Sequence, residues 1–332
     1  FRRYLHKNLE DFIIETPLEN PLDFLNKQFD ASLIKDIQTK WIPYDFKNQN
    51  IDDFLENLNI DKTVEISSIQ GGYSNAIKQL NKFIEVGYQD YAKYRSDPSK
   101  EASSQLSPYF HHGQISTHEV FDKISELESW SPESINPKMV GRREGWWGST
   151  ENFESFMDEL ITWRELGYHT CVRRANYNQY SSLPEWAIKT LHEHSSDERE
   201  HIYSLDELTY SQTHDEIWNA AQNQLRTQGV IQNYLRMLWG KKILEWTPNP
   251  QIALSYMITL NDRYSLDGRD PNSYSGVFWI LGRYDRAWGP ERSIFGKIRY
   301  MTSDSTARKF NLKPYLEKWG NESLGVSTSI SK

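Results

Sequence analysis

The sequence has 332 residues, of which 25% are charged and 37% hydrophobic, and its formal net charge is −8. Its mean hydropathy of −0.75 and the lack of an apolar run near the ~18–20 residues of a membrane span argue against an integral membrane protein. The 12 Trp, 19 Tyr and 14 Phe residues exclude chain-wide disorder, because such rings are usually buried or used in binding. The single cysteine, Cys171, excludes a disulfide framework and a cysteine-ligated metal cluster.

The start of the sequence lacks the signs of a secretory signal, which are a positively charged start, an apolar stretch and a small-residue cleavage site. We therefore expect a location in the cytoplasm with the nucleoid, or in the nucleus or an organelle of a eukaryote. The first residue is Phe1 and not methionine. We also expect, for this reason, that an amino-terminal part is missing from this sequence.

Charge is distributed unevenly along the chain. Residues 230–332 hold 15 Lys or Arg against 9 Asp or Glu, whereas the rest holds 23 basic and 37 acidic residues. A local basic face determines the field that a phosphate backbone meets, so the acidic total does not exclude a nucleic-acid partner. A solvated basic surface explains the same asymmetry, and charge alone does not separate the two interpretations.

The pattern of prolines and apolar residues divides the chain into three parts. In residues 1–62, prolines interrupt short apolar patches and acidic residues dominate, which predicts an irregular linker of the kind that joins domains. Residues 63–315 show helical patterns separated by Ser, Asp, Gly and Pro, which predicts one helical domain. Residues 316–332 form a predicted polar tail.

Helical periodicity is the strongest structural signal. Apolar residues recur at three- and four-residue steps in the segments 76–88, 156–170, 217–225 and 235–246, as in amphipathic helices. Strand alternation is scarce, and neither repeats nor low-complexity tracts occur. The sequence therefore predicts a mainly α-helical fold.

Hydroxyl side chains precede one predicted helix. Ser103 and Ser104 come shortly before the segment Leu106-Ser107-Pro108-Tyr109-Phe110. Hydroxyls and unpaired backbone N–H groups at a helix start can hold phosphate oxygens. An ordinary helix cap explains the same pattern, so both interpretations stay open here.

Two further polar segments are candidate sites. Residues 261–272 lack the alternating carboxylates of a calcium loop, and they fit either a polar loop beside a buried ligand or a solvated turn. His192, His194 and His201 alternate with acidic residues and lack the spacing of zinc ligands, so we expect no metal site. The sequence also has no GxSxG, GxxxxGK[ST], HExxH or GxGxxG motif.

Tryptophans are unusually frequent. Trp218, Trp239 and Trp246 fall on two consecutive predicted helices. Core packing explains most buried tryptophans. A row of indoles could instead relay single electrons, and rings in a basic cleft could stack on an extruded base.

From residue 91 to 310 the sequence resembles the flavin-binding part of the cryptochrome/photolyase superfamily, and within it the class II cyclobutane pyrimidine dimer photolyases. The resemblance is carried by several collinear motifs, which are Leu106-Ser107-Pro108-Tyr109, Trp163-Arg164-Glu165-Leu166, Trp218-Asn219-Ala220-Ala221-Gln222, Tyr234-Leu235-Arg236-Met237, Leu266-Asp267-Gly268-Arg269-Asp270-Pro271-Asn272 and Ile294-Phe295-Gly296-Lys297-Ile298-Arg299. Two positions depart from the family pattern: Gln232 stands where histidine is common, and His112 replaces an apolar or aromatic residue.

The resemblance implies an all-helical domain that holds FAD, with the reduced anionic flavin as the active form. Light then drives one electron from the flavin to a flipped pyrimidine dimer, whose ring splits, and the electron returns. The expected partner is UV-damaged DNA, with no membrane partner and a monomeric protein. Because residue 1 already resembles the interdomain linker, we expect the amino-terminal α/β antenna domain, and hence an antenna chromophore, to be absent.

The resemblance also assigns residues to the cofactor. Asn261 matches the amide that faces flavin N5, and Arg236 and Asp267 match an ion pair beside the flavin ring, where fixed charges tune the redox potential. A purely structural salt bridge is the alternative for that pair. The remaining implied cofactor contacts are Tyr91, Ser103, Ser104, Leu106, Ser107 and Asn219.

The resemblance places further residues at the lesion. Glu159 matches a carboxyl group that hydrogen-bonds the dimer, a role that calls for burial to raise its pKa. The implied lesion pocket also includes Trp163, Asn233, Tyr234, Met237, Trp279 and Trp288, with Arg286 and Arg292 as contacts to backbone phosphates. Trp239, Trp218 and Trp246 match the electron chain that reduces oxidised flavin, with Trp239 nearest the ring.

The resemblance leaves two alternative functions open. A cryptochrome-like photoreceptor would keep FAD and the tryptophan chain but would signal instead of repairing DNA. A flavin-free DNA-binding or structural relic would keep only the fold. A dimer-shaped pocket favours repair, because a signalling protein has no use for it.

Overall fold

The computed structural model describes residues 1–13, 17–18, 20, 23, 31–42, 45, 47 and 50–321. Helices form the regular structure of these residues, and none of them belongs to a β-strand. The prediction of a mainly α-helical fold is therefore confirmed. The main helices of the first half are α5 (Tyr73–Lys82), α6 (Tyr91–Tyr94), α7 (Ser107–His111), α8 (Thr117–Leu127), α9 (Glu151–Met157) and α10 (Arg164–Arg173). Those of the second half are α11 (Glu185–Glu193), α12 (Leu205–Thr209), α13 (Glu216–Gln228), α14 (Asn233–Glu245), α15 (Pro250–Tyr264), α16 (Pro271–Ile280), α17 (Ser303–Lys309) and α18 (Lys313–Trp319).

Side-chain caps fix where the central helices begin. Each cap accepts a hydrogen bond from a backbone N–H of the first turn, which satisfies a donor that the helix itself leaves unpaired. The caps are Asp215 for α13, Gln232 for α14, Asn249 for α15 and Asp270 for α16. Gln232, one of the two departures from the family pattern, therefore has a structural role, because its amide also donates to the carbonyl of Arg95.

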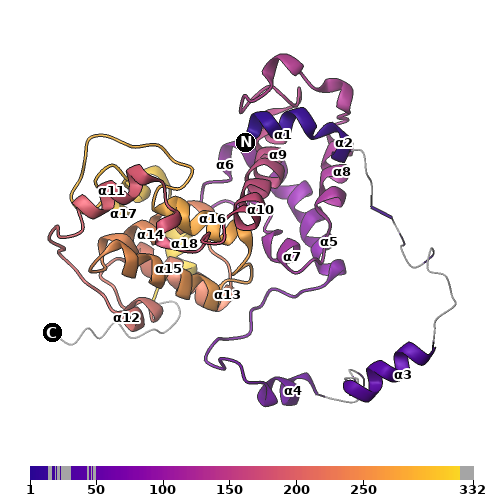
Figure 1. The fold of residues 1–332 in the computed structure, drawn as a ribbon, viewed down its shortest axis with the longest axis horizontal. Coiled ribbons are helices and arrows are strands. Elements are labelled where there is room, and N and C mark those ends of the chain that lie inside the picture. Colours follow the sequence, from indigo (N-terminus) through magenta and orange to yellow (C-terminus); the bar gives the residue numbers. More distant parts are fainter. Residues whose placement is uncertain are drawn as a thin grey trace.

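The apolar side chains form two clusters, which appear as the two groups of helices in Figure 1. The first cluster gathers residues of α5 to α9, with Phe83, Tyr91 and Phe156 packed ring to ring. The second gathers residues of α11, α13, α14, α15 and α16, and it includes the buried Trp218 and Trp239. Helix α10 continues from α9 through a π-helical segment and packs against α16, so this long helix connects the two groups.

A close approach of α10 and α16 depends on glycine. A Cβ atom at Gly167 would lie 2.7 Å from Oδ1 of Asn272 and 2.9 Å from Oγ of Ser275. Because glycine has no Cβ atom, Gly167 allows α10 and α16 to come into contact at this point. The contact matters for the site described below, because α16 carries Trp279 and the residues just before α10 include Trp163.

The amino-terminal segment is more ordered than the predicted linker. Helix α1 (Arg2–Asn8) packs on the first group, where the His6 ring stacks on Trp146 with centroids 3.9 Å apart and accepts a hydrogen bond from the Gly141 N–H. Helices α3 (Ala31–Lys40) and α4 (Ile51–Asn57) lie away from both groups (Figure 1). The described residues of the predicted linker thus include short helices, since prolines limit the length of a helix but do not forbid one.

The predicted boundaries at residues 62 and 315 stay predictions. Helix α18 crosses residue 315, and Leu316 and Trp319 pack on the second core. The rest of the predicted polar tail, from residue 322 on, lies outside the described residues. In the part of the chain that the structure describes, no helix is long and apolar enough to cross a membrane.

His6 gives the docking of α1 a pH dependence. Burial, helped by the nearby Arg2, lowers the pKa of His6 from 6.5 to about 4. The unfolded chain therefore takes up a proton at a higher pH than the folded chain, so stability is complete above about pH 6.5 and falls as the pH drops toward about 4. We expect the loss in unfolding free energy between these pH values to be smaller in His6→Gln than in the unchanged protein. Equal pH dependence in both, measured by denaturant titration, would contradict this.

Candidate functional site

Helices α14, α15 and α16 bring polar side chains together next to the second core. Asn261 is 2% exposed, and its Oδ1 accepts a hydrogen bond from Arg236 at 3.1 Å while its amide nitrogen donates to Ser273. Arg236 also lies 3.6 Å from the carboxylate of Asp267. We call Arg236, Asn261, Asp267 and Ser273 the amide cluster. The structure thus joins three residues that the sequence assigned to the flavin ring, and it adds Ser273, which sequence reasoning missed.

Asp267 is ionised within this cluster. Burial raises the pKa of Asp267, but the Arg236 guanidinium and the hydroxyls of Ser265 and Ser107 outweigh it, so the pKa lies below its ordinary value. The Ser107 contact matters because Ser107 begins α7, in the stretch predicted to hold phosphate. The amide cluster and the predicted phosphate stretch therefore meet at one carboxylate.

The other predicted cofactor residues border the same region with different exposures. Leu106 is fully buried and Tyr91 is 6% exposed, whereas Ser103 and Ser104 are half-buried and Ser107 is exposed. The Gln79 amide donates to the Ser104 carbonyl at 2.9 Å and holds this stretch against α5. Three hydroxyl side chains thus lie on a stretch that Leu106 anchors in the first core.

Asn219, also predicted to contact the cofactor, has a structural role in the turn before α13. Its Oδ1 accepts hydrogen bonds from the backbone N–H of Thr213 at 3.2 Å and from the Thr213 hydroxyl at 2.8 Å, and its amide nitrogen donates to the Thr213 carbonyl at 2.8 Å. Both ends of the side chain are therefore used within the protein. Asn219 therefore holds the turn before α13, and its predicted contact with the cofactor stays a prediction.

A π-helix presents the predicted lesion residues. The segment η6 (Asp158–Trp163) interrupts the long helix between α9 and α10, and such interruptions are frequent at functional sites. Glu159 forms an ion pair with Arg95, and its side chain is 36% exposed. The burial that the predicted role of Glu159 calls for is therefore not present, and Arg95 is a partner that the sequence did not reveal.

Trp163 and Trp279 form the clearest ring pair at this face. Their ring centroids are 4.5 Å apart with planes inclined by 40°, and both side chains are half-buried. Trp279 lies at the end of α16, where the buried Lys241 donates to the carbonyl of Ile280. Burial lowers the pKa of Lys241 to about 7. Two indoles from separate helices thus form one aromatic surface beside Glu159.

The remaining predicted lesion residues lie farther along the second group. Tyr234 contacts Phe310 edge to face, with the Lys309 ammonium 4.5 Å from its ring centroid, and Met237 packs on the second core. Asn233 is exposed at the start of α14. The exposed Arg286 and the nearby Arg299 lie 4.7 and 5.2 Å from the centroid of Trp288. This face therefore combines rings with cations, which suits stacked bases and phosphates.

The three tryptophans predicted to carry electrons are in contact with one another. The indole N–H of Trp218 donates to the backbone carbonyl of Trp239 at 3.0 Å, and the rings of Trp218 and Trp246 have centroids 5.7 Å apart. Trp239 lies one turn after Arg236 on α14 and donates to Gln222 at 2.8 Å. The rings therefore lead from the amide cluster outward.

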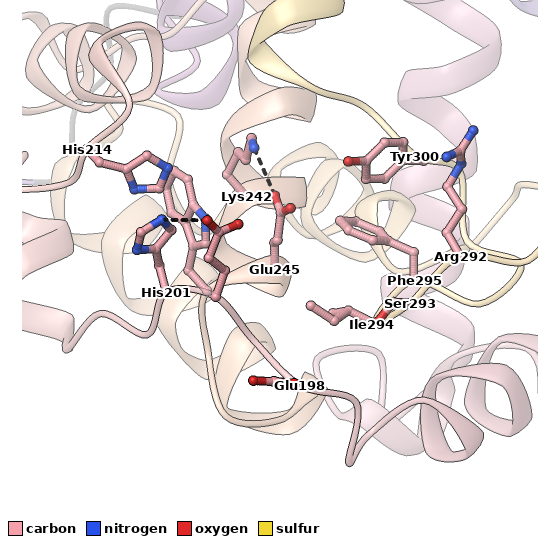
Figure 2. A pocket seen from close by; sticks show the side chains of 12 residues that line it. Glu198, His201, His214, Lys242, Glu245, Arg292, Ser293, Ile294, Phe295 and Tyr300 are labelled. Atoms are coloured by element: carbon pink, nitrogen blue, oxygen red, sulfur yellow. Dashed lines mark ion pairs between the residues drawn. The ribbon is translucent and has the colours of Figure 1, made fainter.

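A cavity of about 400 Å³ lies at the Trp246 end of this row. Figure 2 shows His201 and His214 on one side and Phe295 and Tyr300 on the other. The His214 ring contacts Trp246, and the hydroxyl of Tyr203 hydrogen-bonds with His214 Nδ1 at 2.7 Å. His201, which we expected in a solvated turn, lines this cavity together with Glu198 and Glu200. Arg292, predicted to contact phosphate, also lines it.

Metal chemistry finds no support in the described ranges, where no group of three or more His, Cys, Asp or Glu side chains is placed to hold an ion. The histidines of the 192–201 region pair locally, with His194 Nδ1 2.6 Å from Asp197. His111 Nδ1 lies 3.2 Å from Asp270, the cap of α16.

Known proteins resemble this chain in sequence. It is 40% identical to the deoxyribodipyrimidine photo-lyase of Methanothermobacter thermautotrophicus over 267 residues, which cover 80% of this chain and 55% of the relative. It is 38% identical to the protein of the same name from Potorous tridactylus, with 79% of this chain and 46% of the relative covered. A shorter stretch of 50 residues, 15% of this chain and 8% of the relative, is 50% identical to cryptochrome-2 of Arabidopsis thaliana. No protein-family model matches.

A solved structure shares the fold. The crystal structure of a class III photolyase from Agrobacterium tumefaciens superposes with a TM-score of 0.56 at 16% identity, covering 82% of this chain and 50% of that chain. The chain is thus similar in sequence to deoxyribodipyrimidine photo-lyases and similar in fold to a solved photolyase structure. The chain spans about half the length of the curated relatives that it matches.

Proposed function

We propose that this chain is the catalytic part of a light-driven DNA repair lyase that splits cyclobutane pyrimidine dimers. The observation that carries the proposal is the aromatic surface that Trp163 and Trp279 form, with Glu159 on the same π-helix as Trp163. Trp279 lies at the end of α16, and the start of α16 contributes Ser273 to the amide cluster. The names of the relatives, deoxyribodipyrimidine photo-lyase, support the same activity.

The side chains of the amide cluster fit FAD. A buried amide, a guanidinium and a carboxylate offer donors and acceptors to a flavin ring, and the hydroxyls of Ser103, Ser104 and Ser107 offer contacts to phosphate and ribose. When bound in its reduced anionic form, FAD supplies the light absorption and the single electron for the reaction. Arg236 and Asp267 hold fixed charges beside the ring, and Asn261 holds a neutral amide there.

The lesion-facing residues hold the substrate. A pyrimidine dimer stacks and pairs poorly, so its extrusion costs less than that of an intact base pair. Trp163 and Trp279 stack on the extruded bases and exclude water, while Glu159 hydrogen-bonds their polar edges. Lys309, Arg286 and Arg299, in the second group of helices, supply positive charge that attracts the phosphate backbone of DNA.

Trp239, Trp218 and Trp246 would form the route for electrons toward a bound, oxidised flavin. The cavity at Trp246 gives small reductants access to the outer ring, and His214 is available there to take up a proton. Burial and the nearby His201 lower the pKa of His214, so its imidazole is neutral near pH 7. The match of Trp239, Trp218 and Trp246 to the family pattern supports the assignment to class II.

A cryptochrome-like photoreceptor is the second candidate, favoured by the 50-residue similarity to cryptochrome-2. It shares the flavin and the tryptophan row with the first candidate, so neither discriminates. We further propose a monomer that acts in the compartment that holds the DNA.

The discriminating experiment is a repair assay. Flavin-loaded, chemically reduced protein is mixed with an oligonucleotide that contains a thymine dimer, and the dimer is quantified after blue light or darkness. We expect loss of the dimer only in the light. A yellow protein that leaves the dimer intact in the light would contradict repair and favour the photoreceptor, and a purified protein without flavin absorption would contradict both.

A further inference from the structure

The segment that precedes the helical domain in sequence contacts the lesion-facing surface. Helix α1 places Arg2 against the π-helix η6, 156 residues away along the chain. One guanidinium nitrogen of Arg2 donates to Oδ1 of Asp158 at 2.7 Å and to Oδ2 at 2.9 Å. The side chains of Arg2 and Asp158 are 21% and 9% exposed. This is a largely buried ion pair, which orders its partners more strongly than an exposed pair does.

The same carboxylate holds Trp163. Oδ2 of Asp158 accepts a hydrogen bond from the indole N–H of Trp163 at 3.1 Å, and the Arg2 guanidinium carbon lies 5.9 Å from the centroid of that ring. The two residues are five apart, the spacing of one π-helical hydrogen-bonded turn. An indole has only this one donor. The hydrogen bond to Asp158 therefore fixes the orientation of the Trp163 indole, while the ring of Trp163 contacts Trp279.

We propose that Arg2 and Asp158 are positioning residues for lesion recognition, holding the Trp163 indole in the orientation that stacks on a pyrimidine dimer. This inference rests on the proposed function, and it makes the segment before residue 63 part of the recognition site. Asp158 acts through Trp163 and does not itself touch the substrate. Undamaged DNA is bound mainly through backbone charge, so its affinity does not depend on this orientation.

The test measures binding in the dark, so it needs no photochemistry. The affinities of the flavin-loaded protein for a dimer-containing duplex and for the same undamaged duplex are compared by fluorescence anisotropy. We expect Asp158→Leu to weaken dimer binding by about tenfold, the size of one lost hydrogen bond to a charged group, with undamaged duplex binding unchanged. Asp158→Asn keeps an acceptor for the indole but loses the charge, so we expect an intermediate effect.

Two variants on α1 provide the matched comparison. Arg2→Gln removes the partner of Asp158 and is expected to lower the preference for dimer DNA. Lys7→Gln makes the same charge change at an exposed position of the same helix, and is expected to leave the preference unchanged. Helical circular dichroism and flavin content check the fold of each variant, and Asp158→Asn keeps the test decisive if Asp158→Leu does not fold.

Several outcomes would overturn the inference. One is an unchanged preference in both Asp158→Asn and Arg2→Gln, and another is an equal loss of affinity for both duplexes in the Asp158 variants. A third is a loss in Lys7→Gln as large as that in Arg2→Gln, which would assign the effect to overall charge. If the unchanged protein showed no preference for dimer DNA, the proposed function itself would fail, and the inference with it.

Discussion

Replacement of Trp218 by phenylalanine is expected to abolish photoreduction of the oxidised protein while repair by chemically reduced protein continues. Trp218 is fully buried, contacts Trp246 through its ring and contacts the Trp239 carbonyl through its indole N–H. Phenylalanine fills most of the space but is much harder to oxidise, so the row of rings is interrupted at its middle. The flavin spectrum under blue light with a thiol reductant measures photoreduction.

The control for this prediction is Trp319→Phe, because Trp319 packs on the same core but has no place in the row. It is expected to photoreduce normally. The cost of Trp218→Phe in unfolding free energy is expected to be about 1–3 kcal/mol, as for other large-to-small core changes. Normal photoreduction in Trp218→Phe, or loss of repair by its chemically reduced form, would show that the proposed electron route is wrong.

Replacement of Glu159 by alanine is expected to lower the yield of repaired dimers by about tenfold, the size of a lost hydrogen bond to a charged group. Flavin content should not change, because Glu159 lies at the lesion-facing surface and outside the amide cluster. The quantum yield of repair in saturating dimer DNA measures the effect. Glu159→Gln keeps hydrogen-bonding atoms and is expected to retain more activity.

Glu159→Ala also removes the ion-pair partner of Arg95, so a change in charge must be separated from a lost contact with the dimer. Burial lowers the pKa of Arg95, but Glu159 and Tyr91 raise it overall. Because arginine is not deprotonated in proteins, removal of Glu159 leaves the charged guanidinium without its carboxylate partner. Glu165 offers a matched control, since it also pairs with an arginine, Arg164, but is half exposed and lies beyond η6. If Glu165→Ala lowered the yield as much as Glu159→Ala, the effect would reflect net charge and not contact with the dimer.

Much of the fold could be predicted from local patterns in the sequence. The periodicity over 217–225 and 235–246 predicted α13 and α14, because apolar spacing acts within one or two turns. The same logic failed for residues 1–13, where α1 is held by contacts of His6 and Arg2 with residues more than 130 positions away. Local patterns carry no information on such contacts.

The candidate site was predictable where the family pattern marks it and not elsewhere. The resemblance assigned Arg236, Asn261 and Asp267, and the structure joins all three. It did not reveal Ser273, nor that η6 is π-helical, because the residues of a π-helix are those of an ordinary amphipathic helix. It also did not reveal that Asn219, a residue in a family motif, holds the Thr213 turn through three hydrogen bonds.

The central claim is that reduced flavin bound by this chain absorbs the light that splits the dimer, and an action spectrum tests it most directly. The rate of dimer loss from an oligonucleotide is measured at a series of wavelengths with fully reduced protein, and each rate is divided by the photon flux. The account predicts that these values follow the absorption spectrum of the reduced flavin in the same sample and vanish in the dark. Dimer loss in the dark, or none at wavelengths that the reduced flavin absorbs, would contradict it.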